Sequence, residues 1–100
     1  MVAILKETAP ALRAMRLDDL ERVVALEMEA YEFPWTLGIF RDCLRAGYEC
    51  WVLASSHEVI GYSILSVAAG EAHLLNVCIA TAHCRSGHGT RMVRRMIDLA

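Results

Sequence analysis

The spacing of apolar residues changes several times along the chain, and each change marks the end of one element and the start of another. Around Leu12 and Ala14 the side chains alternate in character, which predicts a short first strand. Two segments with helical spacing follow, then three strand-like segments, and finally a third helical segment. The predicted order is therefore β-α-α-β-β-β-α, an α/β fold with a mixed sheet whose second to fourth strands form an antiparallel meander.

The first helical segment runs from about Asp19 to Ala30. Asp18 and Glu21 have the spacing of a capping box, which predicts that Asp18 is the N-cap of this helix. Glu27 interrupts the apolar stripe, and we expect it to lie at the edge of that stripe; the alternative is a functional role. The side chains expected to face the core are Leu20, Val23, Val24, Met28 and Tyr31.

A proline separates this helix from the next one. Pro34 disfavours helical geometry in the residue before it, so the first helix must end there. Thr36 is a good N-cap for a second helix, and Gly47 can end that helix in the left-handed conformation. Two consecutive helices after one strand leave a loop that can form the wall of a pocket. The apolar face of the second helix is formed by Leu37, Phe40 and Leu44.

Three strands are predicted in the middle of the chain, at residues 49–54, 59–68 and 71–79. A polar turn of hairpin length, SSHE, joins the first two, and Ala69-Gly70 joins the second to the third. Gly61 lies inside the long middle strand, where glycine indicates a β-bulge or a close approach of another backbone.

Length and composition favour one packed domain. The chain has 100 residues, 56% of them hydrophobic and 22% charged. We assign residues 1–11 to a leader and residues 12–100 to the domain. No apolar run reaches the roughly 20 residues that span a bilayer, and the first ten residues lack the order of a secretory signal. We therefore expect a cytoplasmic protein with no membrane partner, and the net charge of −2 gives no general attraction to nucleic acid.

The cysteines and histidines suggest neither disulfides nor a metal site. The four cysteines have no C-x-x-C spacing, so we expect reduced and mostly buried thiols. A zinc site is the alternative, because several side chains near the end of the chain are of zinc-binding types, but their spacings match no familiar zinc motif. These side chains are His73, Cys78, His83, Cys84 and His88.

The last helical segment, residues 92–100, has no C-terminal glycine and no following strand to receive its apolar face. A helix that leaves the edge of a sheet ordinarily crosses back to a parallel strand. We therefore expect the sequence to be the first part of a longer domain. A dimer that covers the exposed edge is the alternative, and the oligomeric state stays open.

The loop Arg85 to Thr90 is the strongest candidate for a binding site. It stands between a strand and a helix, where unpaired backbone N–H groups and the helix dipole favour an anion. Gly87 and Gly89 let the backbone approach a ligand, Arg85 can pair with a phosphate, and Ser86 or Thr90 can donate a hydroxyl. The loop matches neither the P-loop nor the Rossmann fingerprint. The alternative is a glycine turn that holds no ligand.

The order of elements, the strand LLNVCIA and the loop R-x-G-x-G resemble the acetyl-CoA-binding core of the GNAT superfamily of N-acetyltransferases. The resemblance covers about residues 12–100. The superfamily loop most often begins with Gln or Arg, where this chain has Cys84. Within the superfamily, AYEFPWT and EAHLLNVCIA are similar to the bacterial ribosomal-protein-alanine N-acetyltransferases, the RimI type.

The resemblance implies the N-terminal part of the GNAT fold and an enzyme that transfers acetyl from acetyl-CoA to the α-amine of a ribosomal protein with an N-terminal alanine. The alternative is a non-catalytic CoA-binding or partner-binding fragment. By resemblance, the backbone of Val77, Cys78 and Ile79 lines the donor. The residues expected to hold its pyrophosphate are Arg85, Ser86, Gly87, His88, Gly89 and Thr90.

The resemblance also places Phe33, Pro34 and Trp35 in the wall around the incoming peptide, although such a turn can simply join two helices. In enzymes of this type the general base is a Glu and the general acid a Tyr, both on segments that follow the donor-binding helix, and the chain does not include them. His73 is a weak candidate base, because other members carry a catalytic Glu on this strand and imidazole titrates near neutrality. We favour a structural histidine there.

Three arginines follow the glycine loop. They are positioned to reach the 3′-phosphate of coenzyme A or an acidic partner, but a solvated helix face is the preferred interpretation. These residues are Arg91, Arg94 and Arg95.

Overall fold

The computed structural model describes residues 10–80, 94–95 and 98. Its elements are β1 (Ala11–Ala14), the 3₁₀ turn η2 (Leu17–Asp19), α1 (Leu20–Ala30), α2 (Leu37–Arg45), β2 (Glu49–Ser55), β3 (Glu58–Ala68) and β4 (Glu71–Ile79). Residues 94, 95 and 98 are helical, as predicted for the third helical segment. Most of the proposed leader and the whole glycine loop lie outside the described residues.

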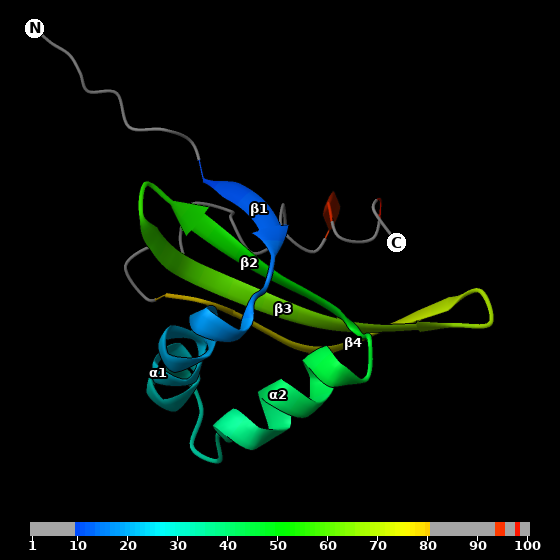
Figure 1. The fold of residues 1–100 in the computed structure, drawn as a ribbon, viewed down its shortest axis with the longest axis horizontal. Coiled ribbons are helices and arrows are strands. Elements are labelled where there is room, and N and C mark those ends of the chain that lie inside the picture. The colour runs from blue at the N-terminus through cyan, green and yellow to red at the C-terminus, as the bar shows by residue number, and fades with distance from the viewer. Residues whose placement is uncertain (1–9, 81–93, 96–97, 99–100) are drawn as a thin grey trace, which may run out of the picture.

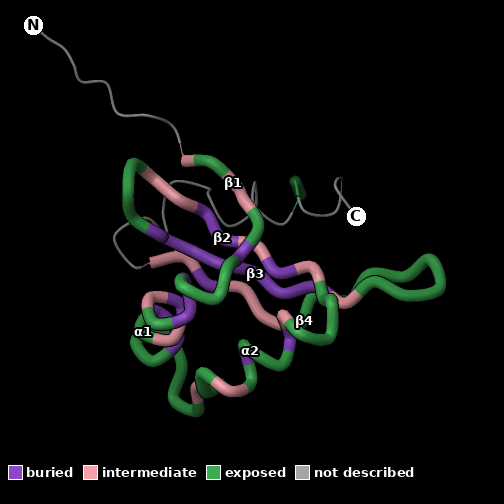
Figure 2. Tube along the Cα trace, viewed as in Figure 1, coloured by how far each residue is buried: buried purple, intermediate pink, exposed green. Residues whose placement is uncertain are grey.

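The described strands form one sheet with both long helices on the same face (Figure 1). The strand order is β1-β2-β3-β4, and every pairing among these four strands is antiparallel. The predicted meander is therefore confirmed. The far end of the β3–β4 hairpin extends away from the body of the molecule, and it is exposed on both strands (Figure 2).

The main core lies between the sheet and the two helices. Phe40 from α2 and Tyr62 from β3 are both fully buried, and their rings meet edge to face with centroids 5.4 Å apart. This geometry suits aromatic pairs and fixes α2 against the centre of the sheet. A smaller cluster, formed by Leu53, Ile60 and Leu65, lies apart from this core.

The start of α1 differs from the predicted capping box. The helix begins at Leu20 and is preceded by η2, and the residue that organises this turn is Asp19. Its carboxylate accepts the backbone N–H of Arg16 at 2.8 Å and pairs with both terminal nitrogens of Arg13, at 2.8 and 2.9 Å. Asp19 therefore binds a residue of β1 and a residue of the turn at the same time, whereas the side chain of Asp18 is exposed to solvent.

The apolar stripe of α1 also differs from the prediction. Met28, expected in the core, is 64% exposed, and Tyr31 lies just beyond the helix at the edge of a pocket. The line that faces the core runs from Leu20 through Val23 to Glu27, at spacings of three and four residues, and Glu27 is buried with 2% exposure. Glu27 is therefore buried because of its position in the helical spacing, in spite of the polarity of its side chain. The edge position predicted for Glu27 is wrong.

The ends of the second helix agree with the prediction, but its apolar face does so only in part. Phe40 is buried and Leu44 half-buried, whereas Leu37 is exposed because it lies in the first turn, beyond the edge of the core. The hydroxyl of Thr36 accepts the backbone N–H of Ile39 at 3.3 Å and caps the first turn. Gly47 has φ of +79°, the left-handed conformation expected after the helix end.

Two irregularities shape the strands beside the pocket. In β3 the pairing with β2 shifts next to Gly61, and a Cβ at Gly61 would lie 2.8 Å from the carbonyl oxygen of Cys78. Both features expected at Gly61, a bulge and a close backbone approach, are therefore present. In β4 the register passes from Leu74 to Asn76 and leaves Leu75 without a partner residue in β3.

The described cysteines, Cys43, Cys50 and Cys78, are buried free thiols, as predicted. Burial raises the pKa of Cys50 to about 12. In the part of the chain that the structure describes, no helix is long and apolar enough to cross a membrane.

Candidate functional site

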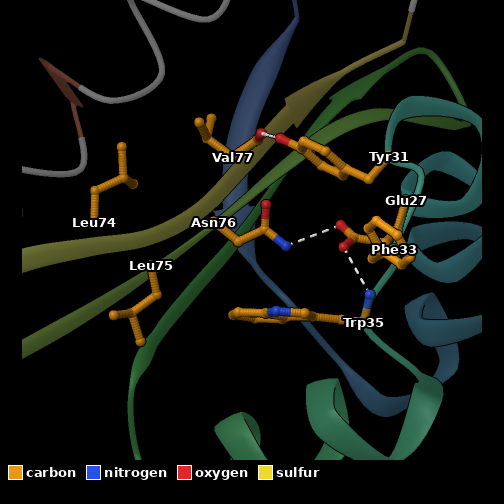
Figure 3. A pocket seen from close by; sticks show the side chains of 8 residues that line it. All are labelled: Glu27, Tyr31, Phe33, Trp35, Leu74, Leu75, Asn76 and Val77. Atoms are coloured by element: carbon orange, nitrogen blue, oxygen red, sulfur yellow. Dashed lines mark hydrogen bonds between the residues drawn. The ribbon is translucent and has the colours of Figure 1, made fainter.

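A pocket of about 360 Å³ opens between β4 and the segment that joins α1 to α2 (Figure 3). The last turn of α1 and the connecting segment form one side of the pocket, and four consecutive residues of β4 form the other. The lining residues are Glu27, Tyr31, Phe33, Trp35, Leu74, Leu75, Asn76 and Val77. Two segments singled out in the sequence, FPW and LLNV, therefore meet across one pocket.

Glu27 is the polar centre of this pocket. Its carboxylate accepts the backbone N–H of Trp35 at 2.8 Å, the side-chain N–H of Asn76 at 2.8 Å and the hydroxyl of Tyr62. Burial, followed by the hydrogen bond to Glu27, raises the pKa of Tyr62, so its hydroxyl keeps the proton that it donates. One carboxylate thus joins α1, the connecting segment, β3 and β4.

Tyr31 closes the pocket at its other end. Its hydroxyl donates a hydrogen bond of 2.6 Å to the backbone carbonyl oxygen of Val77 (Figure 3). Burial is the main cause that raises the pKa of Tyr31, with Cys78 and Glu27 acting in the same direction. The phenol therefore stays protonated and anchors the end of α1 to β4.

The FPW segment supplies an apolar wall. Trp35 is half-buried, and its ring lies 5.3 Å from the ring of Phe40, which is itself packed on Tyr62. Phe33 is 85% exposed and stands at the mouth of the pocket. Pro34, which lies between Phe33 and Trp35 in the sequence, is half-buried and does not line the pocket. The predicted peptide wall thus includes two of its three residues on the pocket surface.

Asn76 owes its position to the bulge at Leu75. Asn76 pairs with Ile64 in β3, and the side chain of Ile64 is in the core that the helices cover. Cross-strand partners point to the same face, so Asn76 also points towards α1. Asn76 was not among the site residues predicted from the sequence, although an amide inside the apolar run HLLNVCIA was a usable signal.

The residues expected to line acetyl-CoA are described only in part. The backbone of Val77 lies at the pocket, while the Cys78 thiol is buried and directed at the carbonyl oxygen of Leu26, 3.9 Å away. Ile79 packs on the smaller cluster. This arrangement fits a ligand that contacts β4 through backbone groups beside the apolar side chains of Leu74 and Leu75. Residues 85–90 lie outside the described part of the chain.

Those of the remaining candidates that the structure describes are not among the residues that line the pocket. His73 is on the projecting hairpin, 65% exposed on its side chain, where its Nε2 lies 3.1 Å from a carboxylate oxygen of Glu71. Arg94 and Arg95 are exposed, and Arg91 lies outside the described residues. No metal-binding cluster occurs among the residues whose positions are described, which include only His73 and Cys78 of the five zinc candidates.

Comparison with known proteins places this geometry in a family context. The family model described as the acetyltransferase (GNAT) family matches residues 10–100. The [ribosomal protein bS18]-alanine N-acetyltransferase of Haemophilus influenzae is 27% identical over 79 residues, which cover 79% of this chain and 54% of that protein.

Two solved structures share the fold. The ribosomal-protein-S18-alanine N-acetyltransferase from Escherichia coli superposes with a TM-score of 0.82 at 24% identity, covering 89% of this chain and 57% of that one. The GphF GNAT-like decarboxylase in complex with isobutyryl-CoA superposes with a TM-score of 0.77 at 16% identity, covering 88% and 57%. The chain spans about half the length of these proteins. Because the family model matches nearly the whole chain, the protein belongs to the acetyltransferase (GNAT) family.

Proposed function

We propose that this protein acts in an acetyl-CoA-dependent N-acetyltransferase of the RimI type, which acetylates the N-terminal α-amine of a ribosomal protein that begins with alanine. The observation that carries the proposal is the pocket between the FPW segment and β4, in a chain of the GNAT family. A relative named for alanine acetylation of ribosomal protein bS18 supports the choice of substrate. A ribosomal substrate in turn supports the cytoplasmic location.

The pocket suits the amino end of a peptide. Its volume of about 360 Å³ is within the range of small-ligand pockets, and it is open at Phe33, where the rest of a chain can leave. The apolar wall formed by Trp35 and Leu75 suits a small side chain such as that of alanine. The polar groups at its base, Glu27 and Asn76, suit the amine.

Acetyl-CoA supplies an activated acetyl group as a thioester. In the proposal, the backbone of Val77, Cys78 and Ile79 holds its pantetheine arm, and Arg85 to Thr90 hold its pyrophosphate. Transfer forms a bond between the amine nitrogen and the acetyl carbon and breaks the bond from that carbon to sulfur. The amine loses a proton to a base, and the thiolate gains one from an acid.

A non-catalytic CoA-binding fragment is the second candidate, and one observation favours it. Among the described residues, the pocket offers no free base, because the Glu27 carboxylate already accepts three hydrogen bonds and His73 lies on the projecting hairpin. Binding of the donor without transfer is the behaviour expected of such a fragment.

One sample can separate these functions. The protein expressed from its complete gene is titrated with acetyl-CoA by calorimetry and then assayed for acetyl transfer to a peptide with a free N-terminal alanine. The matched control is the same peptide with its amine already acetylated. Transfer to the free peptide alone supports the enzyme, and binding without transfer supports the second candidate. Absence of acetyl-CoA binding contradicts both.

A further inference from the structure

Two polar side chains of the pocket donate hydrogen bonds to other groups of the protein. The Asn76 amide nitrogen donates to Glu27 at 2.8 Å, and the Tyr31 hydroxyl donates to the Val77 carbonyl oxygen at 2.6 Å. Since a carboxylate can only accept, the Asn76 amide must present its nitrogen to Glu27 and its oxygen elsewhere. Figure 3 shows this oxygen on the side of the amide away from Glu27.

The oxygen atoms of these two side chains keep the capacity to accept hydrogen bonds from a ligand. In the part of the chain that is described, no residue donates a hydrogen bond to the Asn76 amide oxygen, and every buried side-chain nitrogen or oxygen there has a partner. Together these facts leave the amide oxygen open to the pocket. The Tyr31 oxygen likewise keeps lone pairs after its proton is given to Val77.

The charge in the pocket is also one-sided. Glu27 is buried, accepts three hydrogen bonds from neutral groups and has no ion-pair partner among the described side chains. None of the pocket-lining residues is Lys, Arg or His. A buried carboxylate without a cationic neighbour favours a positive charge nearby, because attraction is strong where water is excluded. The half-buried indole of Trp35, which lies across the pocket below Asn76 in Figure 3, adds an aromatic face that also favours a cation.

We infer that this pocket selects its substrate as the positively charged α-ammonium, with the side-chain oxygens of Asn76 and Tyr31 accepting hydrogen bonds from it. Glu27 is a positioning residue in this scheme: it fixes the orientation of the Asn76 amide and supplies the negative charge. The inference rests on the proposed function, since it names the recognition of the amine that the enzyme acetylates. It also goes beyond that function, because it assigns amine selection to three side chains.

The test compares two peptides that differ only at the first residue. One begins with alanine, and the other carries lactate in its place, so a neutral hydroxyl replaces the ammonium. Their dissociation constants are measured by calorimetry with the complete protein saturated with CoA. We expect the native protein to bind the amine peptide at least about tenfold more tightly, since a hydrogen bond to a charged group contributes about 1.5–3 kcal/mol.

Three variants then test which side chains are responsible for the preference for the amine peptide. Asn76→Leu keeps the size of the side chain and removes the acceptor, so the preference should fall to about twofold or less while acetyl-CoA affinity is retained. Glu27→Gln should do the same, because it removes the negative charge that favours the ammonium in the pocket. Glu29→Gln, the matched loss of charge on an exposed residue of α1, should keep the native preference.

Tyr31→Phe is a further variant, which removes only one hydroxyl and should also reduce the preference for the amine peptide. It replaces the other variants in the test if a substitution in the Glu27 network prevents folding. A preference unchanged in Asn76→Leu and Tyr31→Phe contradicts the inference, as does equal binding of the two peptides by the native protein. Failure of the proposed function gives a different result, in which the native protein transfers no acetyl group to the amine peptide. The two failures are therefore distinguishable.

Discussion

The backbone N–H of Trp35 donates a hydrogen bond of 2.8 Å to the carboxylate of Glu27, which lies eight residues earlier in the chain. This bond ties the segment after α1 back onto the helix, so the wall of the pocket has a fixed position relative to its polar base. Because Tyr62 and Asn76 bind the same carboxylate, the pocket and the core share one network.

Removing that carboxylate should destabilise the protein. Glu27→Ala leaves the donors on Trp35, Asn76 and Tyr62 without their acceptor, and we expect a loss of about 3 kcal/mol in the free energy of unfolding. Glu29→Ala, at an exposed position of the same helix, should change it by less than about 0.5 kcal/mol. Urea unfolding followed by tryptophan fluorescence measures both. Equal stabilities of the two variants would show that the network contributes little.

The Asp19 ion pair should make stability depend on acid pH. The hydrogen bond from Arg13 lowers the pKa of Asp19 in the folded protein, with burial acting against it. A lowered folded-state pKa means that the stabilisation is present above the unfolded value, near 3.8, and is lost as the pH falls below it. Asp19→Asn should lower the free energy of unfolding by about 2 kcal/mol at pH 7. It should also weaken the decrease of stability at acid pH, which is the acid limb of the pH profile.

The control for this pH dependence is Asp18→Asn. Asp18 is adjacent to Asp19 in the sequence, but its side chain is exposed and forms a surface ion pair with Arg16 at 3.5 Å. Its replacement should leave the acid limb unchanged. Thermal unfolding between pH 2 and pH 7 distinguishes the variants, and an identical acid limb in native protein and Asp19→Asn would exclude the assigned cause.

Gly61 and Gly38 should respond in opposite ways to alanine. A Cβ at Gly61 would lie 2.8 Å from the Cys78 carbonyl oxygen, a backbone atom that cannot move without shifting β4, so Gly61→Ala should cost about 2 kcal/mol. At Gly38, in α2, the nearest atoms are 3.7 Å away, and alanine should stabilise the helix by up to about 1 kcal/mol. Thermal unfolding tests both, and a neutral Gly61→Ala would mean that the two strands separate easily.

Much of this fold was accessible from sequence because its signals are local. The caps at Thr36 and Gly47 and the turn at Ala69-Gly70, where both residues have positive φ, depend on a few neighbouring residues. The start of α1 was predicted wrongly because Asp19 is held by Arg13, a residue of β1. An ion pair between two elements cannot be detected from the spacing of apolar residues within either element.

The polar base of the pocket was harder to predict for the same reason. Glu27 was expected at the edge of a stripe, since an acidic side chain is rarely fully buried unless paired. Its partners are contributed from 8, 35 and 49 residues further along the chain, so burial becomes favourable only after the strands have assembled. The apolar wall, by contrast, was identified from the aromatic residues around Pro34.

Cys50 should be chemically inert in the folded protein. Burial raises its pKa to about 12, so almost no thiolate is present at pH 8. We expect alkylation of Cys50 by iodoacetamide to be at least about a hundredfold slower in the native protein than in urea, as measured by mass spectrometry of its peptide. Comparable rates in the two conditions would show that β2 opens readily.

His73 is the remaining candidate base, and its position argues for a structural role. It lies on the exposed end of the β3–β4 hairpin, paired with Glu71, and it is not among the residues that line the pocket. A base must reach the proton that it removes, directly or through one water. If the proposed acetyl transfer occurs, His73→Ala should therefore keep kcat within about twofold of the native value. A decrease of a hundredfold or more would restore His73 as the base and would require the hairpin to close over the pocket during the reaction.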